Sequence, residues 1–110
     1  MSLTMYTGDL EPDLEVTLSS SGGAVDITTA VSVRVIGRRG EDIIFDRAPS
    51  STAVVGQTSV VTMSWVDGDT DDIGRIQVEV EVTWPGTRPQ TFRADGGVDV
   101  RRDFDFVEVP

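Results

Sequence analysis

Hydrophobic and polar residues alternate along much of this chain. In the longest run, residues 75–84, every second residue is apolar: Ile76, Val78, Val80, Val82 and Trp84. A strand places successive side chains on opposite faces, whereas helical spacing would scatter these five residues around the circumference. The run therefore predicts a half-buried antiparallel strand.

Shorter runs repeat this pattern, and turn-forming residues separate them. The runs contain Leu14, Val16 and Leu18; Val31, Val33 and Val35; Ile43 and Phe45; Val61, Met63 and Trp65; Phe92; and Val98 and Val100. Segments rich in Gly, Pro, Ser and Asp lie between them, at 19–23, 37–40, 49–56, 67–74, 85–89 and 95–97. About seven short strands predict an all-β sandwich of two antiparallel sheets, and Pro85-Gly86 predicts a hairpin after the long strand.

The chain length predicts one domain. A chain of 110 residues buries roughly two-thirds of its unfolded surface, so it needs no metal or disulfide to hold a core. The apolar pattern indicates a core over 8–100, with extended arms at 1–7 and 101–110.

The composition argues against most enzyme classes. The sequence has no Cys, His or Lys, which removes the thiolate nucleophile, the imidazole base and metal ligand, and the Schiff-base amine. Carboxylate pairs remain, but Glu79 and Glu81 stand about 7 Å apart simply because they alternate on one strand face. We expect them to face solvent, and we expect no enzyme activity and no cofactor.

The net charge of −10 narrows the class of partner. The nine positive charges are all Arg and are scattered, so the chain lacks the basic surface that binds phosphates. The sequence contains no stretch of about 20 apolar residues, the length that would predict a membrane span. We therefore expect protein partners, with neither nucleic acid nor membrane.

The acidic cluster at 67–72 is a weak metal candidate. Asp67, Asp69 and Asp71 alternate as oxygen ligands of a calcium loop do. In the helix-loop-helix calcium motif, however, the sixth position is Gly and the twelfth is Glu, where this chain has Asp72 and Val78. The alternative is a solvated turn held by bonds from side chains to the backbone.

The charged loop at residues 38–42 has two interpretations. Residues 38–42 predict a charged hairpin tip or a binding loop for an acidic neighbour.

Asp72, Gly74 and Ile76 resemble the Asp-x-Gly-x-Tyr corner of immunoglobulin domains, with Ile in place of Tyr. That resemblance implies an immunoglobulin-like sandwich.

Both ends of the chain carry apolar residues outside the confident strands. We assign them to an assembly interface that comprises Leu3, Met5, Tyr6, Phe104, Phe106, Val107 and Val109. Phe104 and Phe106 share one face of an extended chain, and a soluble monomer rarely exposes such groups. Each end either folds back as an edge strand or pairs with a neighbouring subunit by β-augmentation.

A set of ordered motifs gives the chain a family resemblance. The motifs are Gly8-Asp9-Leu10-Glu11-Pro12, Val25-Asp26-Ile27-Thr28, Trp65-Val66-Asp67-Gly68-Asp69-Thr70, Gly74-Arg75-Ile76-Gln77-Val78-Glu79-Val80 and Thr83-Trp84-Pro85-Gly86. Together they resemble the small immunoglobulin-like domains of tailed bacteriophages, of the type found at the N-terminus of baseplate upper proteins. The resemblance covers roughly residues 8–100 and brings no catalytic residues.

The resemblance implies a structural protein of a virion. We expect the chain to be made in the bacterial host cytoplasm and to dock onto a capsid or a tail or baseplate assembly. Its partners would be other virion proteins, in a symmetric or homo-oligomeric arrangement. The alternative is a receptor- or carbohydrate-binding module that uses the loops around Arg38, Asp69 and Pro85.

Overall fold

The computed structural model of the chain describes residues 2–94 and 96–101, and its regular elements there are all strands. They are β1 (Ser2–Tyr6), β2 (Leu14–Leu18), β3 (Ser32–Arg39), β4 (Asp42–Arg47), β5 (Ser51–Val55), β6 (Thr58–Met63), β7 (Gly74–Thr83), β8 (Gln90–Arg93) and β9 (Gly97–Arg101). The predicted all-β class is confirmed, with nine strands in place of about seven.

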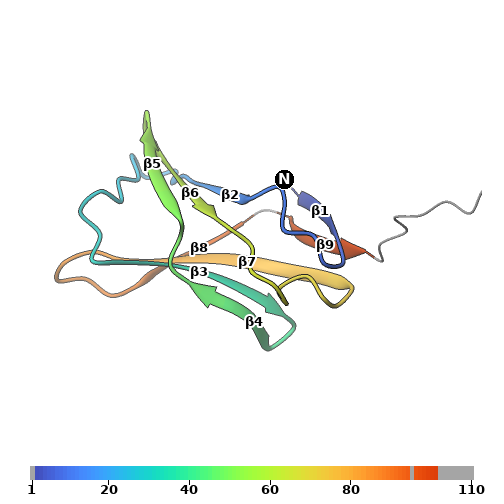
Figure 1. Cartoon of the computed structure of the whole chain (residues 1–110). Helices are drawn as coiled ribbons and strands as arrows, with labels where there is room; N and C mark the ends of the chain where they lie inside the picture. The colour runs from blue at the N-terminus through green and yellow to red at the C-terminus, as the bar shows by residue number, and fades with distance from the viewer. Residues whose placement is uncertain (1, 95, 102–110) are drawn as a thin grey trace, which may run out of the picture.

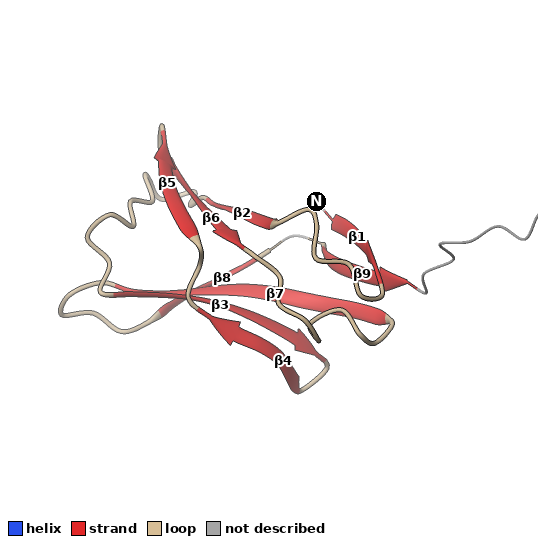
Figure 2. Cartoon of the chain, in the orientation of Figure 1, coloured by secondary structure: helices blue, strands red, loops and turns tan. Residues whose placement is uncertain are grey.

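The strands form two sheets that lie in separate layers (Figures 1 and 2). One sheet has the order β1-β9-β7-β3-β4 with β8 also paired to β7, and the other has the order β2-β6-β5. β8 and β9 pair with different parts of β7, so they act as one interrupted strand. Two sheets in two layers are compatible with a β-sandwich, as predicted.

The core lies between the two layers. Four residues of β7 point into it with at most 1% of their surface exposed: Ile76, Val78, Val80 and Val82. Leu14, Val16 and Leu18 of β2 face them from the other sheet, with Val61 and Met63 of β6. Each such side chain contributes roughly 1.5–3 kcal/mol on burial, so the period-2 pattern of the sequence is also the energetic basis of the fold.

A β-bulge changes the expected pattern in the β3–β4 hairpin. The pairing register shifts between Gly37 and Arg38, so Phe45 is buried whereas Ile43 on the same strand is 54% exposed. The ring of Phe45 lies directly over Gly37, and a Cβ on Gly37 would stand 2.3 Å from Phe45 Cε2. The hairpin tip predicted at 38–42 is confirmed, with Gly40 in the left-handed region at φ 63°.

The apolar pattern did not predict β5, and it left β1 as one of two alternatives for the N-terminal segment, an edge strand of the same chain. β5 occupies most of the segment 49–56, which the sequence assigned to turns, and every one of its residues is exposed. β1 occupies the predicted N-terminal arm and pairs with β9 in parallel, so one pair departs from the expected antiparallel arrangement. Both are edge strands, where burial on one face is not required for pairing.

Candidate functional site

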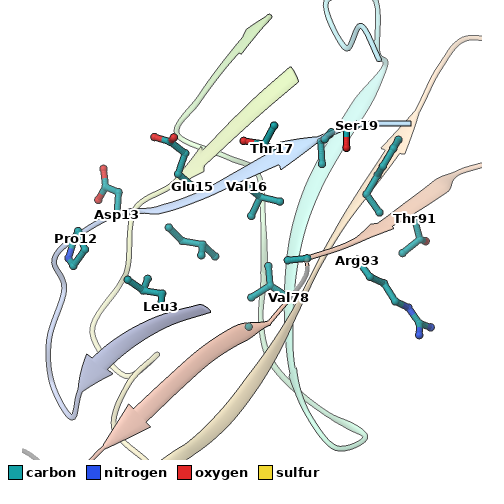
Figure 3. A pocket seen from close by; sticks show the side chains of 15 residues that line it. Leu3, Pro12, Asp13, Glu15, Val16, Thr17, Ser19, Val78, Thr91 and Arg93 are labelled. Carbon is teal, nitrogen blue, oxygen red and sulfur yellow. The ribbon is translucent and has the colours of Figure 1, made fainter. Parts of the chain in front are cut away.

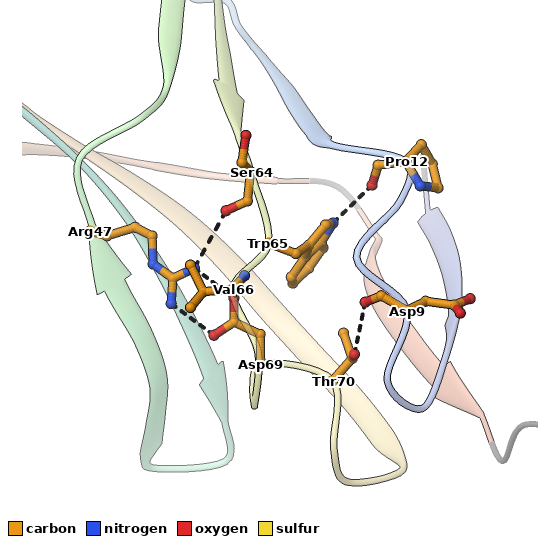
Figure 4. A network of polar contacts seen from close by, with 8 residues as sticks. All are labelled: Asp9, Pro12, Arg47, Ser64, Trp65, Val66, Asp69 and Thr70. Carbon is orange, nitrogen blue, oxygen red and sulfur yellow. Dashed lines mark hydrogen bonds and ion pairs between the residues drawn. The ribbon is translucent and has the colours of Figure 1, made fainter.

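A part-buried ion pair joins the end of β4 to the 66–70 turn that follows β6 (Figure 4). Arg47, at the end of β4, donates from Nη1 and Nη2 to the two carboxylate oxygens of Asp69 at 2.6 and 2.7 Å. Asp69 also accepts from the backbone N–H of Val66 at 2.9 Å, and its side chain is 5% exposed. Both carboxylate oxygens are therefore used inside the fold.

Aromatic contacts extend this network towards the β1–β2 connection. The guanidinium of Arg47 lies 5.3 Å from the ring centre of Phe45, which meets the ring of Trp65 edge to face at 5.6 Å. The indole N–H of Trp65 donates to the carbonyl of Pro12 at 2.9 Å, and the Thr70 hydroxyl donates to the carbonyl of Asp9 at 2.9 Å. The network thus fastens β4, the 66–70 turn and the segment after β1 to one another.

These contacts argue against the weak metal site considered at Asp67, Asp69 and Asp71. Asp69 points inward to Arg47, whereas Asp67 and Asp71 are exposed to solvent. Among residues 2–94 and 96–101, no three carboxylates are gathered in a way that would hold a metal ion. A guanidinium on the central carboxylate supplies the positive charge that a cation would otherwise bring, so the structure favours the turn interpretation.

The loop around Pro85 gives little support to sugar stacking. Trp84 precedes it, but its indole is packed against the core and donates its N–H to the carbonyl of Asp26 at 2.9 Å. Asp26 in turn accepts bonds from the hydroxyl and the backbone N–H of Thr28, at 2.6 and 2.9 Å. These two bonds lower the pKa of Asp26 below its ordinary value of 3.8, and the bond from the hydroxyl has the larger effect.

The charged residues of the β3–β4 hairpin also bind within the chain. Arg39 donates to the carbonyl of Asp72 at 2.9 Å and lies against Gly74, in the corner that leads into β7. Arg38 lies 3.6 Å from the carboxylate of Glu79, which stands 4.0 Å from Arg93. The side chain of Glu79 is 17% exposed, so this carboxylate is less solvent-facing than the sequence predicted, because two guanidinium groups flank it.

The residues assigned to an assembly interface lie in different environments. Met5 is 1% exposed and sits in the core beside Val100, so it is a core residue and its assignment to an interface is wrong. Pairing with β9 orients this alternate residue inward. Leu3 is half-buried and Tyr6 is 44% exposed. The other four, Phe104, Phe106, Val107 and Val109, lie outside the described residues.

A groove of about 750 Å³ with both apolar and polar lining residues opens on the side of the sandwich (Figure 3). It runs between β2 and the strands β8 and β9, and Leu3 of β1 contributes to it. Its lining includes the side chains of Val16, Val78 and Phe92, with charged residues at its rim. The sequence pattern does not reveal this groove, because its residues belong to strands of the two different sheets.

Two strand edges border this groove. β2 ends the three-stranded sheet, and β8 pairs with β7 alone in the described part of the chain. β5 ends the three-stranded sheet on its other side, with Val54 and Val55 40% and 60% exposed. Edge strands present unpaired backbone N–H and C=O groups, which can bind a further strand. Chemically, the arrangement is suited to protein association.

Comparisons of the chain with protein-family models, with curated proteins and with solved structures find no match. In the described ranges, no helix is long and apolar enough to cross a membrane.

Proposed function

We propose that this chain is a non-enzymatic structural protein of a tailed-bacteriophage virion. It docks onto a capsid or a tail or baseplate assembly through its sheet edges and terminal segments, and its partners are other virion proteins in a symmetric or homo-oligomeric arrangement. The order of sequence motifs that resembles phage immunoglobulin-like domains supports this proposal.

The exposed edge strand β5 is the observation that carries the proposal. All five of its residues are exposed, and its sequence Ser-Thr-Ala-Val-Val contains no charge and no proline. Soluble monomers usually protect such an edge with charged residues, proline, a bulge or a covering element. An edge of this kind suits a protein whose working state is an assembly, where another chain pairs with it.

The chemistry of the sequence points the same way. Without His, Cys or Lys, acid-base and nucleophilic catalysis would have to rest on carboxylates, hydroxyls and Arg. The buried carboxylate of Asp69 is held by Arg47 and the backbone, so it serves the fold. A scaffold needs none of the missing side chains.

Mass spectrometry of purified virions, with heads and tails separated, tests the proposal. We expect the chain as a stoichiometric component of one fraction. Its absence from complete particles would overturn the proposal. Binding of the purified chain to a glycan array, lost on Trp84→Ala without loss of folding, would instead support the receptor- or carbohydrate-binding alternative.

A further inference from the structure

The groove between β2 and β8 has the features of a site for an extended chain. Its lining combines apolar side chains, among them Val16, Val78 and Phe92, with charged and hydroxyl side chains, and its volume of about 750 Å³ lies in the range of protein binding pockets. Two strand edges border it, so backbone groups are available beside an apolar surface. A strand added there would gain ladder hydrogen bonds and would insert alternate side chains.

We propose that the occupant is segment 103–109 of a second copy of this chain. This inference rests on the assembly role proposed above and names the contact that joins two copies. In an extended conformation Phe104 and Phe106 share one face, while Asp103 and Asp105 share the other. The segment would therefore insert two aromatic rings and keep two carboxylates in solvent, and each ring buries roughly 150–250 Å².

Charge complementarity gives the direction of the added strand. Asp13 and Glu15 lie towards one end of the groove and Arg93 towards the other, as Figure 3 shows. Arg102 lies directly before the segment and precedes the two Phe residues, and Glu108 follows them. Glu108 stands six positions after Arg102, about 20 Å along a strand, and Ser19 at the end of the groove likewise stands six positions after Asp13. The strand would therefore run parallel to β2.

The path of β9 favours a second copy over the same chain. β9 begins at Gly97, which lines the groove, and runs about 13 Å away from it to Arg101. β9 pairs with β1 along one edge and with β7 along the other, so the same chain cannot return along β9 as a hairpin that leads back to the groove. The segment of another copy meets no such restriction.

Self-association of the full chain, measured by sedimentation velocity over a range of concentrations, tests the contact. We expect association in the unaltered chain and a loss on the order of 100-fold or more in the variant Phe104→Ser/Phe106→Ser, because two large apolar groups would no longer be buried. The matched control is the double variant Val107→Ser/Val109→Ser. In an extended segment these two residues lie on the opposite face from Phe104 and Phe106, so the control should associate nearly as the unaltered chain does. A chain that is monomeric at every concentration, or equal losses in both variants, would overturn the proposal.

A charge exchange tests the direction. The side chain of Arg93 is 83% exposed, so it can be replaced with little effect on the core. We expect Arg93→Glu to weaken association roughly two- to fivefold, as for an exposed ion pair, and Glu108→Arg added to it to restore association. Weakening that is not restored would argue against a strand parallel to β2.

Disulfide trapping identifies the edge, since the chain has no cysteine of its own. Full chains with Asp105→Cys are mixed with chains carrying Glu15→Cys or Thr17→Cys on β2, or Ala53→Cys on β5. We expect an intermolecular disulfide with one of the two β2 positions. Trapping on β5 would assign the segment to the other edge. A disulfide within one chain that carries both Thr17→Cys and Asp105→Cys, in a monomer, would assign it to the same copy. Either result would overturn the proposal.

Virion incorporation separates this inference from the proposed function. If the chain is a virion component and Phe104→Ser/Phe106→Ser enters particles at full occupancy, the assembly role stands and the segment contact fails. If the chain is absent from virions yet associates through the segment in solution, the contact stands and the virion role fails.

Discussion

β7 and β5 are both rich in valine, yet they lie at opposite extremes of exposure. β7 is central in the large sheet, with β3 on one side and β8 and β9 on the other, and its inward residues are at most 1% exposed. Within residues 2–94 and 96–101, β5 pairs only with β6, and it is exposed along its whole length. A β-forming sequence therefore establishes a strand, while its neighbours decide whether it stabilises the core or remains available to a partner.

The largest expected effect is the difference between a core residue of β7 and an exposed residue of β5. Ile76→Ala should lower the free energy of unfolding by about 2–5 kcal/mol, because it removes buried carbons and leaves a cavity. Val55→Ala, at a site 60% exposed, should change it by less than about 0.5 kcal/mol. Urea unfolding of both variants measures the difference, and equal losses would contradict it.

The ion pair between β4 and the 66–70 turn comes next. Asp69→Ala should cost about 2–3 kcal/mol, below the value for a fully buried pair because Arg47 is 27% exposed. The control is Asp46→Ala, which removes the exposed pair with Arg34 and should cost less than about 1 kcal/mol. Thermal and urea unfolding measure both. If Asp46→Ala were the more harmful variant, Asp69 would not be the carboxylate that fastens the 66–70 turn to β4.

Gly37 tests the bulge in the large sheet. Alanine in place of a strand glycine normally stabilises a protein by roughly 0.5–1 kcal/mol. Here the new Cβ would meet the ring of Phe45, so we expect Gly37→Ala to destabilise by about 1–3 kcal/mol. The same substitution in a Phe45→Leu background should cost less, and a double-mutant cycle in urea measures that difference. An unchanged cost would show that the ring is not the cause.

The smallest effect concerns the exposed loop that connects β2 and β3. The Thr28 hydroxyl and backbone N–H hold the pKa of Asp26 below 3.8, so this interaction stabilises the fold above that pH and is lost as the pH falls through the lower, folded value. Thr28→Ala should raise the pKa of Asp26 and slightly lower stability at neutral pH. The difference from the unaltered chain should vanish in strong acid. NMR titration of the Asp26 carboxyl measures its pKa. A pKa that Thr28→Ala leaves unchanged would show that the Thr28 hydroxyl does not lower it.

Much of the fold could be predicted from periodicity alone. The inward residues of β2, β6, β7 and β9 alternate as a half-buried strand requires, and the structure buries them. The hairpin at residues 38–42 follows from a glycine flanked by charged residues between two strands. The bulge at Gly37 could not be predicted in this way, because a shift in register depends on how one strand meets another.

The candidate site was less predictable. The acidic residues at 67–72 suggested a weak metal site, and the partner that decides the role of Asp69 is Arg47, 22 residues away in the chain. The groove likewise combines residues from both sheets. Local spacing holds no information on such contacts.

By itself, the sequence determined the all-β class, the inward residues of β2, β6, β7 and β9, and the absence of the side chains that most catalytic chemistry uses, because these depend on period-2 alternation and on which side chains are present. Only the tertiary structure decided that Met5 is a core residue, that Asp69 binds Arg47, and that β2 and β5 are left at sheet edges. The physical reason is that pairing and burial depend on contacts between segments far apart in the chain.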